Sequence, residues 1–153
     1  SFRFDKDQGW FFESPPMPLP FHIQVAKGYR MYVSGHTVRV ISKRRDAGLE
    51  IAMLGKYSGL DENQCFSIQE KLAKKNCSSY LESGYMAKLS TKTLCSKTSS
   101  FFENSPDDTK KQKVQQWTLF QKGQLFCITT WRRNGDQYAL SSISDMLDNL
   151  TFN

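Results

Sequence analysis

Two strand-like runs near the C-terminal end constrain the fold of this chain more than any other feature. Residues 114–120 and 125–131 are dense in β-branched and aromatic residues. The four residues between them include Gly123, which can adopt a positive φ, so the pattern predicts an antiparallel hairpin. Both faces of the second run are largely apolar, which predicts a central strand covered on both sides.

A helix is predicted directly after this hairpin. Ser142 can cap its first turn, and Asp145 places a carboxylate where the helix dipole favours one. Four apolar residues recur at helical spacing and form one stripe, which we expect to pack on the sheet: Ile143, Met146, Leu147 and Leu150.

The first half of the chain reads as an antiparallel meander. Alternating runs separated by short turns occupy residues 21–25, 29–33, 37–41 and 49–54. A helix follows, capped by Ser58 or Asp61 and ending at Asn76. Its predicted apolar stripe consists of Cys65, Ile68 and Leu72, joined in part by Gln69.

Residues 77–100 are rich in Ser, Thr and Lys, with strands predicted at 85–89 and 91–100. The order is therefore meander, helix, further strands, hairpin, helix. That order predicts an α+β fold with an antiparallel sheet of about six or seven strands and two helices packed on it.

At 153 residues the chain is expected to hold one α+β domain, residues 21–153, preceded by an N-terminal arm, residues 1–20. The arm is aromatic, with Trp10 and Phe11 as candidate partner-binding residues. Four of the seven residues 14–20 are proline, which favours polyproline II. Pro15 and Pro18 have the P-x-x-P spacing that docks in aromatic grooves; a stiff linker is the alternative.

The net charge of +6 favours acidic partners, but the basic residues form four small clusters at the ends of predicted elements. Solvated turns and helix C-termini are the preferred explanation of these clusters, and a shared basic face is the alternative. Arg30, between Tyr29 and Tyr32 and near Arg39, is the first candidate for a basic and aromatic binding surface. The second is the pair Arg132 and Arg133 after Trp131.

The sequence carries no motif typical of an enzyme, a metal site or a cofactor site. G-x-S-x-G, the P-loop, G-x-G-x-x-G and H-E-x-x-H are all absent. The four cysteines and two histidines have no zinc-ligand spacing. Cys65 and Cys127 lie on apolar faces and are expected to be buried thiols, with one or two disulfides as the alternative.

No apolar run approaches the roughly 20 residues of a membrane span. The chain does not begin with Met, so a leader or anchor removed before Ser1 stays open, and with it a periplasmic or lumenal location.

From residue 49 onward the chain resembles the PsbP-like fold, which is shared with Ran-binding Mog-type proteins. The points of similarity are the strand LEIAMLGKYS, the helix DENQCFSIQEKLAKK, the hairpin ending LFCITTW, and the closing ISDMLDNLTF with Leu150 and Phe152 at its end. The proline-rich arm does not match the usual opening of that family. The resemblance implies a non-enzymatic domain that docks on larger assemblies, and it assigns no functional residue.

We therefore expect a non-enzymatic interaction module, an accessory or structural component of a multiprotein assembly in a membrane-associated or secretion-type setting. Its partners would be other protein subunits, with no metal or cofactor. The alternative is a basic surface that binds nucleic acid or anionic lipid. The candidate partner-binding residues are Trp10, Phe11, Pro15, Pro18, Tyr29, Arg30, Arg39, Arg132 and Arg133.

Overall fold

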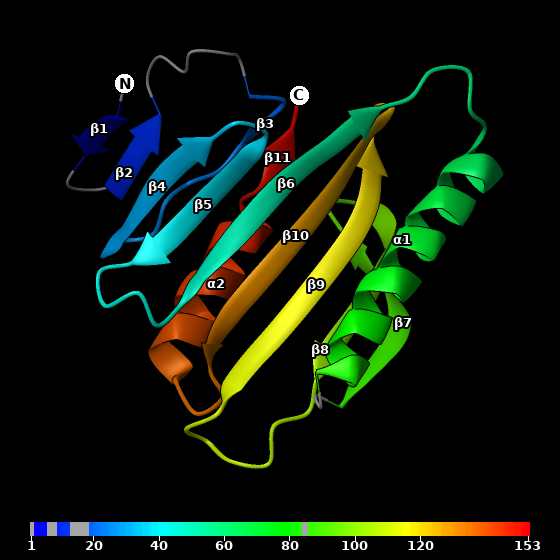
Figure 1. Cartoon of the computed structure of the whole chain (residues 1–153). Coiled ribbons are helices and arrows are strands. Elements are labelled where there is room, and N and C mark those ends of the chain that lie inside the picture. Colours follow the sequence, from blue (N-terminus) through cyan, green and yellow to red (C-terminus); the bar gives the residue numbers. More distant parts are fainter. Residues whose placement is uncertain (1, 6–8, 13–18, 84–85) are drawn as a thin grey trace.

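A seven-stranded antiparallel sheet forms the centre of the computed structural model (Figure 1), which describes residues 2–5, 9–12, 19–83 and 86–153. The strand order across the sheet is β4-β5-β6-β10-β9-β8-β7. The predicted α+β class is confirmed. The bounds are β4 (Tyr29–Ser34), β5 (Thr37–Ser42), β6 (Gly48–Lys56), β7 (Ala87–Leu94), β8 (Lys97–Asn104), β9 (Gln112–Gln121) and β10 (Gln124–Arg133).

The sheet consists of two meanders that meet at one seam. β4, β5 and β6 follow one another, and so do β7, β8, β9 and β10. The seam pairs β6 with β10, from Gly48 opposite Trp131 to Lys56 opposite Gln124, with a bulge between Leu125 and Phe126. β10 therefore lies in the middle of the sheet, as predicted. The predicted cover on both of its faces is not found among the described residues, because α2 packs on one face and the other belongs to the half of the sheet that α1 does not cover.

The two helices lie on opposite faces of this sheet (Figure 1). α1 (Glu62–Glu82) carries the chain from β6 to the far edge and packs over β7, β8 and β9, whereas α2 (Gln137–Asp148) contacts β6 and β10. Two neighbouring residues of β9 show that the helices lie on opposite faces, because successive side chains of a strand point to opposite faces. Gln116 accepts a hydrogen bond from Asn76 of α1, while Trp117 belongs to the core cluster that contains Ile143 of α2.

The face covered by α2 holds the apolar core. Ile51, Leu119, Phe126 and Ile128 are almost fully buried there. Each such side chain contributes roughly 1.5–3 kcal/mol through burial, before the loss of entropy is subtracted. Phe101 packs on Trp117 with ring centroids 5.0 Å apart.

A short two-stranded sheet joins the beginning and the end of the core. β3 (Phe21–His22) pairs with β11 (Thr151–Phe152). The predicted strand over residues 21–25 is therefore shorter and does not belong to the meander, although Phe21, Ile23 and Val25 are buried as their alternation indicates. A second pair, β1 (Phe2–Asp5) and β2 (Gly9–Phe12), lies beside β4.

α1 packs on the sheet through both polar and apolar side chains, including the Tyr80 ring, whose centroid lies 5.2 Å from that of Phe102. The buried residues of the helix are Gln69, Ala73 and Cys77, whereas the predicted stripe of Cys65, Ile68 and Leu72 is only half-buried. Gln69 Nε2 donates to the Thr98 carbonyl at 3.1 Å. The buried side is therefore centred on Gln69, at the edge of the predicted stripe, because the strand beneath it offers a hydrogen-bond acceptor.

Both helices differ in length from the prediction. α1 continues to Glu82, past the predicted end at Asn76, because Asn76 is engaged by Gln116 of β9. Its N-cap is Asp61, which forms a capping box with Gln64. α2 begins at Gln137, and its N-cap is Asp136, not Ser142.

Candidate functional site

Half of one sheet face lacks a helix in the described part of the chain. α1 covers β7, β8 and β9 on that face, and the rest of the face belongs to β4, β5, β6 and β10. Register places one row of side chains across it, because directly paired residues share a face. The row is Tyr32, Arg39, Glu50, Thr129 and Gln116, and Gln116 contacts α1. We call the β4, β5, β6 and β10 part of this surface the open face.

Polar contacts connect the open face to α1. Arg39 Nε donates to Glu50 Oε2 at 2.8 Å, and the Arg39 side chain is 58% exposed. Thr129 accepts a hydrogen bond from Gln116 Nε2 at 3.0 Å. Asn76 of α1 donates to Gln116 at 2.9 Å. These contacts fix the side chains of the row without closing the face to solvent.

A second row on the open face contains Arg30, Ile41, Gly48 and Trp131. The Trp131 ring lies over Gly48: a Cβ at that position would be 2.7 Å from Trp131 Cζ2 and 2.5 Å from the Val40 carbonyl oxygen. Gly48 is therefore required for the ring to lie against the sheet. Trp131 stays half-buried and is available on one side.

The structure brings three of the predicted partner-binding residues together on the open face. Arg30 and Arg39 belong to the two rows, and Arg133 shares the parity of Trp131. Tyr32, which is 42% exposed, lies on the same face. The sequence signal that assigns Tyr32 and Trp131 to this face is that alternate side chains along a strand point to the same face.

Two other candidates are not on this face. Tyr29 is 3% exposed and lies in the core opposite the open face, where burial raises the pKa of its hydroxyl although a hydrogen bond with Ser142 acts in the opposite sense. Arg132 is 9% exposed, and its Nη1 donates to the carbonyls of Arg133 and Asn134 at 3.2 and 2.8 Å. Both predictions treated neighbours in a strand as one surface, whereas neighbours point to opposite faces.

The remaining candidates belong to the N-terminal arm. Trp10 and Phe11 lie in β2. Pro15 and Pro18 lie outside the described residues.

The cysteine at the open face has a thiol of low reactivity. All four cysteines lie in the described ranges, and they are free thiols. Cys127, beside the open face, is 8% exposed, and burial raises its pKa to about 11, against hydrogen bonds with Thr118 and Thr129 that lower it. Such a thiol stays protonated at neutral pH and is a poor nucleophile. Among the described residues, no three His, Cys, Asp or Glu side chains are grouped so that they could hold a metal ion.

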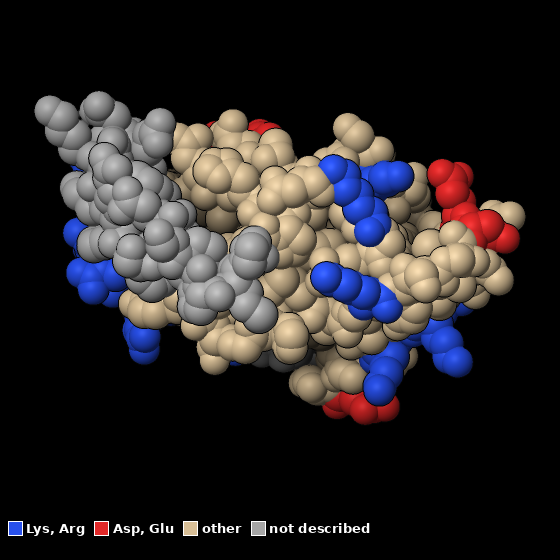
Figure 2. Space-filling model, turned by 90° about the horizontal axis from the view of Figure 1, so that it is seen from above, with Lys and Arg blue, Asp and Glu red and all other residues tan. Residues whose placement is uncertain are grey.

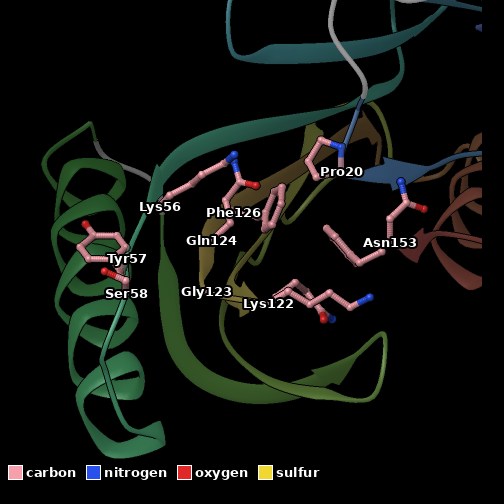
Figure 3. Close-up of a pocket in the computed structure, with 11 residues that line it drawn as sticks. Pro20, Lys56, Tyr57, Ser58, Lys122, Gly123, Gln124, Phe126 and Asn153 are labelled. Atoms are coloured by element: carbon pink, nitrogen blue, oxygen red, sulfur yellow. The ribbon is translucent and has the colours of Figure 1, made fainter.

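A cleft of about 460 Å³ opens at the end of the sheet where β9 turns into β10 (Figure 3). One wall comes from Lys56, Tyr57 and Ser58, together with the turn residues 122–124. The other wall comes from Pro20 and Asn153. Phe126, Phe152 and Gln121 complete the lining.

Hydrogen bonds hold both walls in place. The Tyr57 N–H donates to the Gly123 carbonyl at 2.7 Å, and the Asn153 N–H donates to the Pro20 carbonyl at 2.9 Å. Gly123 has φ +77°, and a Cβ there would be 2.9 Å from the Tyr57 carbonyl oxygen. The prediction of a positive φ at Gly123 is confirmed. The turn requires glycine because of this positive φ and because a Cβ would be too close to the Tyr57 carbonyl oxygen.

Neither helix in the described ranges combines the length and the apolar character that a membrane crossing requires.

Comparison with known proteins shows the fold. No protein-family model matches the chain, and no curated protein matches it. A crystal structure at 1.50 Å of a protein from Bacteroides thetaiotaomicron matches with a TM-score of 0.58 and 9% identity; the match covers 88% of this chain and 45% of that one. The chain thus spans less than half the length of that protein.

The solution structure of cyanobacterial PsbP (CyanoP) from Synechocystis sp. PCC 6803 is also similar. Its TM-score is 0.57 at 10% identity, and the match covers 100% of this chain and 92% of that one. The fold is therefore PsbP-like, which confirms the resemblance drawn from the sequence.

Proposed function

We propose that this chain, which has a PsbP-like fold, is a non-enzymatic interaction module that docks on a larger multiprotein assembly through its open face. One observation carries the proposal: in the described part of the chain, half of a sheet face has no helix over it and presents arginine and aromatic side chains from the three strands β4, β5 and β10. The partner is another protein subunit. The chain acts as an accessory or structural component of the assembly.

The composition of the open face supports this assignment. Arginine, tyrosine and tryptophan are the residue types that most often contribute binding energy at protein interfaces. Here Tyr32 and Trp131 are near Arg30, Arg39 and Arg133 on one rigid sheet. Because the ion pair with Glu50 already orders the Arg39 side chain, binding through Arg39 would cost less conformational entropy.

The experiment is affinity capture from native extract, with low-salt and then high-salt washes. We compare the unmodified protein with the double variant Arg30→Glu/Arg133→Glu. The matched control is Lys43→Glu/Lys110→Glu, which makes the same change in charge at exposed loop residues. Defined proteins should survive the high-salt wash with the unmodified protein and with the control, but not with the open-face variant. Equal capture by both variants would contradict docking through this face.

The proposal also includes the N-terminal arm, residues 1–20, as a part of the chain that the partner binds. Deletion of residues 1–20 should abolish complex formation and leave the α+β domain folded, as circular dichroism and thermal unfolding would report. A truncated chain that captures the same partners would remove the arm from the interaction.

A second candidate function is binding of nucleic acid or anionic lipid. The observation that favours it is that Arg30, Arg39 and Arg133 share a face with Tyr32 and Trp131, since arginines beside stacking aromatics suit single-stranded nucleic acid. Against it, Glu50 pairs with Arg39. Figure 2 looks onto the end of the sheet and not onto the open face, and on that end the Lys and Arg side chains lie in several groups separated by uncharged residues.

Salt dependence distinguishes the two functions. Binding through phosphate contacts would weaken steeply as salt rises, with one unit of log–log slope for each contact or a little less. Affinity for single-stranded RNA or anionic vesicles that changes little between low and moderate salt would exclude the second function.

A further inference from the structure

The cleft at the end of the sheet combines an apolar floor with a positively charged rim. The accessible part of this floor is the half-buried Phe152, and the ring of Phe126, which is 1% exposed, supports it from beneath with the two centroids 4.7 Å apart. The floor cannot collapse further, because Phe21 packs against both rings, at 6.3 and 6.0 Å. An apolar or aromatic group can therefore bury surface there without rearranging the core.

The charged residues in the lining are both lysines. Lys56 comes from the end of β6 and Lys122 from the turn between β9 and β10, and Figure 3 shows their side chains on different sides of the cleft. Neither aspartate nor glutamate is among the described lining residues. The cleft thus favours a negative charge, and the side-chain amides of Gln121 and Gln124 add hydrogen-bonding groups.

The rim is formed before any ligand arrives. The hydrogen bond from Tyr57 to Gly123 ties the turn to the chain after β6, and the hydrogen bond from Asn153 to Pro20 ties the opposite wall together. A preformed concave site loses little affinity to loop ordering. The volume of about 460 Å³ lies within the usual range for small-molecule sites.

From these observations we propose that the cleft binds a small amphipathic anion, with an aromatic ring on Phe152 and a carboxylate-type group between Lys56 and Lys122. This site is separate from the open face and does not depend on the proposed docking function. Its residues come from β6, the β9–β10 turn and the chain ends, whereas the docking residues Arg30, Arg39 and Arg133 do not line it.

The test is an NMR titration of the whole chain with 2-naphthoate as the probe. The uncharged 2-naphthylmethanol and the cationic 2-naphthylmethylamine serve as matched probes. Naphthoate should shift the amide signals of residues 122–124 and 152–153, with a Kd on the order of 1 mM, as expected for a ligand of this size. The amine should bind at least about ten times more weakly, because the rim is positive.

Two lysine variants test where the carboxylate of the probe binds. Lys56→Gln and Lys122→Gln should each weaken naphthoate binding by about threefold or more, whereas Lys88→Gln, an exposed lysine on the edge strand β7, should leave it unchanged. The open-face variant Arg30→Glu/Arg133→Glu should also bind naphthoate normally, so failure here and failure of the docking function are distinguishable. No shift at 10 mM probe, equal affinity for the three probes, or insensitivity to both lysine variants would overturn the proposal.

Discussion

Single residues decide how the two exposed sites are built. Gly48 allows Trp131 to lie against the sheet, and Gly123 allows the β9–β10 turn to approach Tyr57. The sequence identifies Gly123 as a turn residue, because it lies between two apolar runs. The sequence gives no such signal for Gly48. Glycine is required there because of the Trp131 ring, which is 83 positions away in the chain.

Replacing Gly48 by alanine should destabilise the fold by about 1–3 kcal/mol, the usual cost of overpacking, because the new methyl group would meet the Val40 carbonyl and the Trp131 ring. The control is Gly55→Ala in the same strand, where the nearest atom lies at 3.5 Å. Urea unfolding measures both variants. Equal midpoints would mean that Trp131 moves aside at no cost.

The raised pKa of Cys127 predicts how the stability of the fold changes at alkaline pH. Its pKa is about 11 in the folded chain against an ordinary value of 9.0, so the unfolded chain loses this proton first. The folded state is therefore favoured fully below pH 9, and the advantage of up to about 2–3 kcal/mol is lost as pH rises from 9 to 11. Urea unfolding between pH 8 and 10.5 should show a shallower pH dependence in Cys127→Ala than in the unmodified chain. Parallel profiles would contradict the raised pKa.

Elements were predictable where local chemistry alone determines them. The hairpin of β9 and β10 and the apolar stripe of α2 follow from short-range patterns, and the structure confirms them. The buried side of α1 was predictable only in part, because Gln69 and Asn76 bond to groups of strands that come later in the chain, Thr98 and Gln116. A periodicity argument selects apolar residues, so it places Gln69 only at the edge of the stripe.

The open face was predictable only in part. Arg30 and Arg39 belong to strands whose alternation is clear, but their proximity to Arg133 depends on the seam between β6 and β10, which pairs segments far apart in sequence. Tyr29 and Arg132 lie on the opposite face, because neighbours in sequence within a strand point to opposite sides of the sheet.

The N-terminus of α1 offers a test at the scale of one element. The Asp61 side chain accepts a hydrogen bond from the Gln64 N–H at 2.8 Å, and Gln64 Oε1 accepts one from the Asp61 N–H at 2.9 Å. Asp61→Ala should lower the free energy of unfolding by about 1 kcal/mol, the typical cost of losing a cap. Ser58→Ala, at the other sequence-predicted cap, should have no measurable effect in the same urea titration. A larger loss at Ser58 would contradict the assigned cap.

At the scale of the whole molecule, the core is closed by contact between its first and last residues. Phe21 of β3 and Phe152 of β11 pair across their strands and both pack on Phe126 of the central strand. The two ends of the domain are therefore side by side (Figure 1). Stability and the shape of the cleft both depend on this arrangement.

Phe152→Ala should cost about 2–4 kcal/mol, somewhat less than a fully buried phenylalanine, because the ring is only half-buried. Thermal unfolding measures the loss. Tyr138→Ala, at an aromatic residue that is 70% exposed on α2, should change stability by no more than about 0.5 kcal/mol. A small effect at Phe152 would show that the pairing of the chain ends contributes little.

The seam between β6 and β10 has a consequence for synthesis on the ribosome. β4, β5 and β6 emerge first, but the strand that covers the inner edge of β6 is the last of the sheet to be made. Until β10 arrives, the apolar Leu49 and Ile51 and an unpaired row of backbone groups are exposed to other chains. Slow translation or crowding of nascent chains should therefore promote aggregation of this protein, and a chaperone that shields β6 during elongation should raise the yield of folded protein.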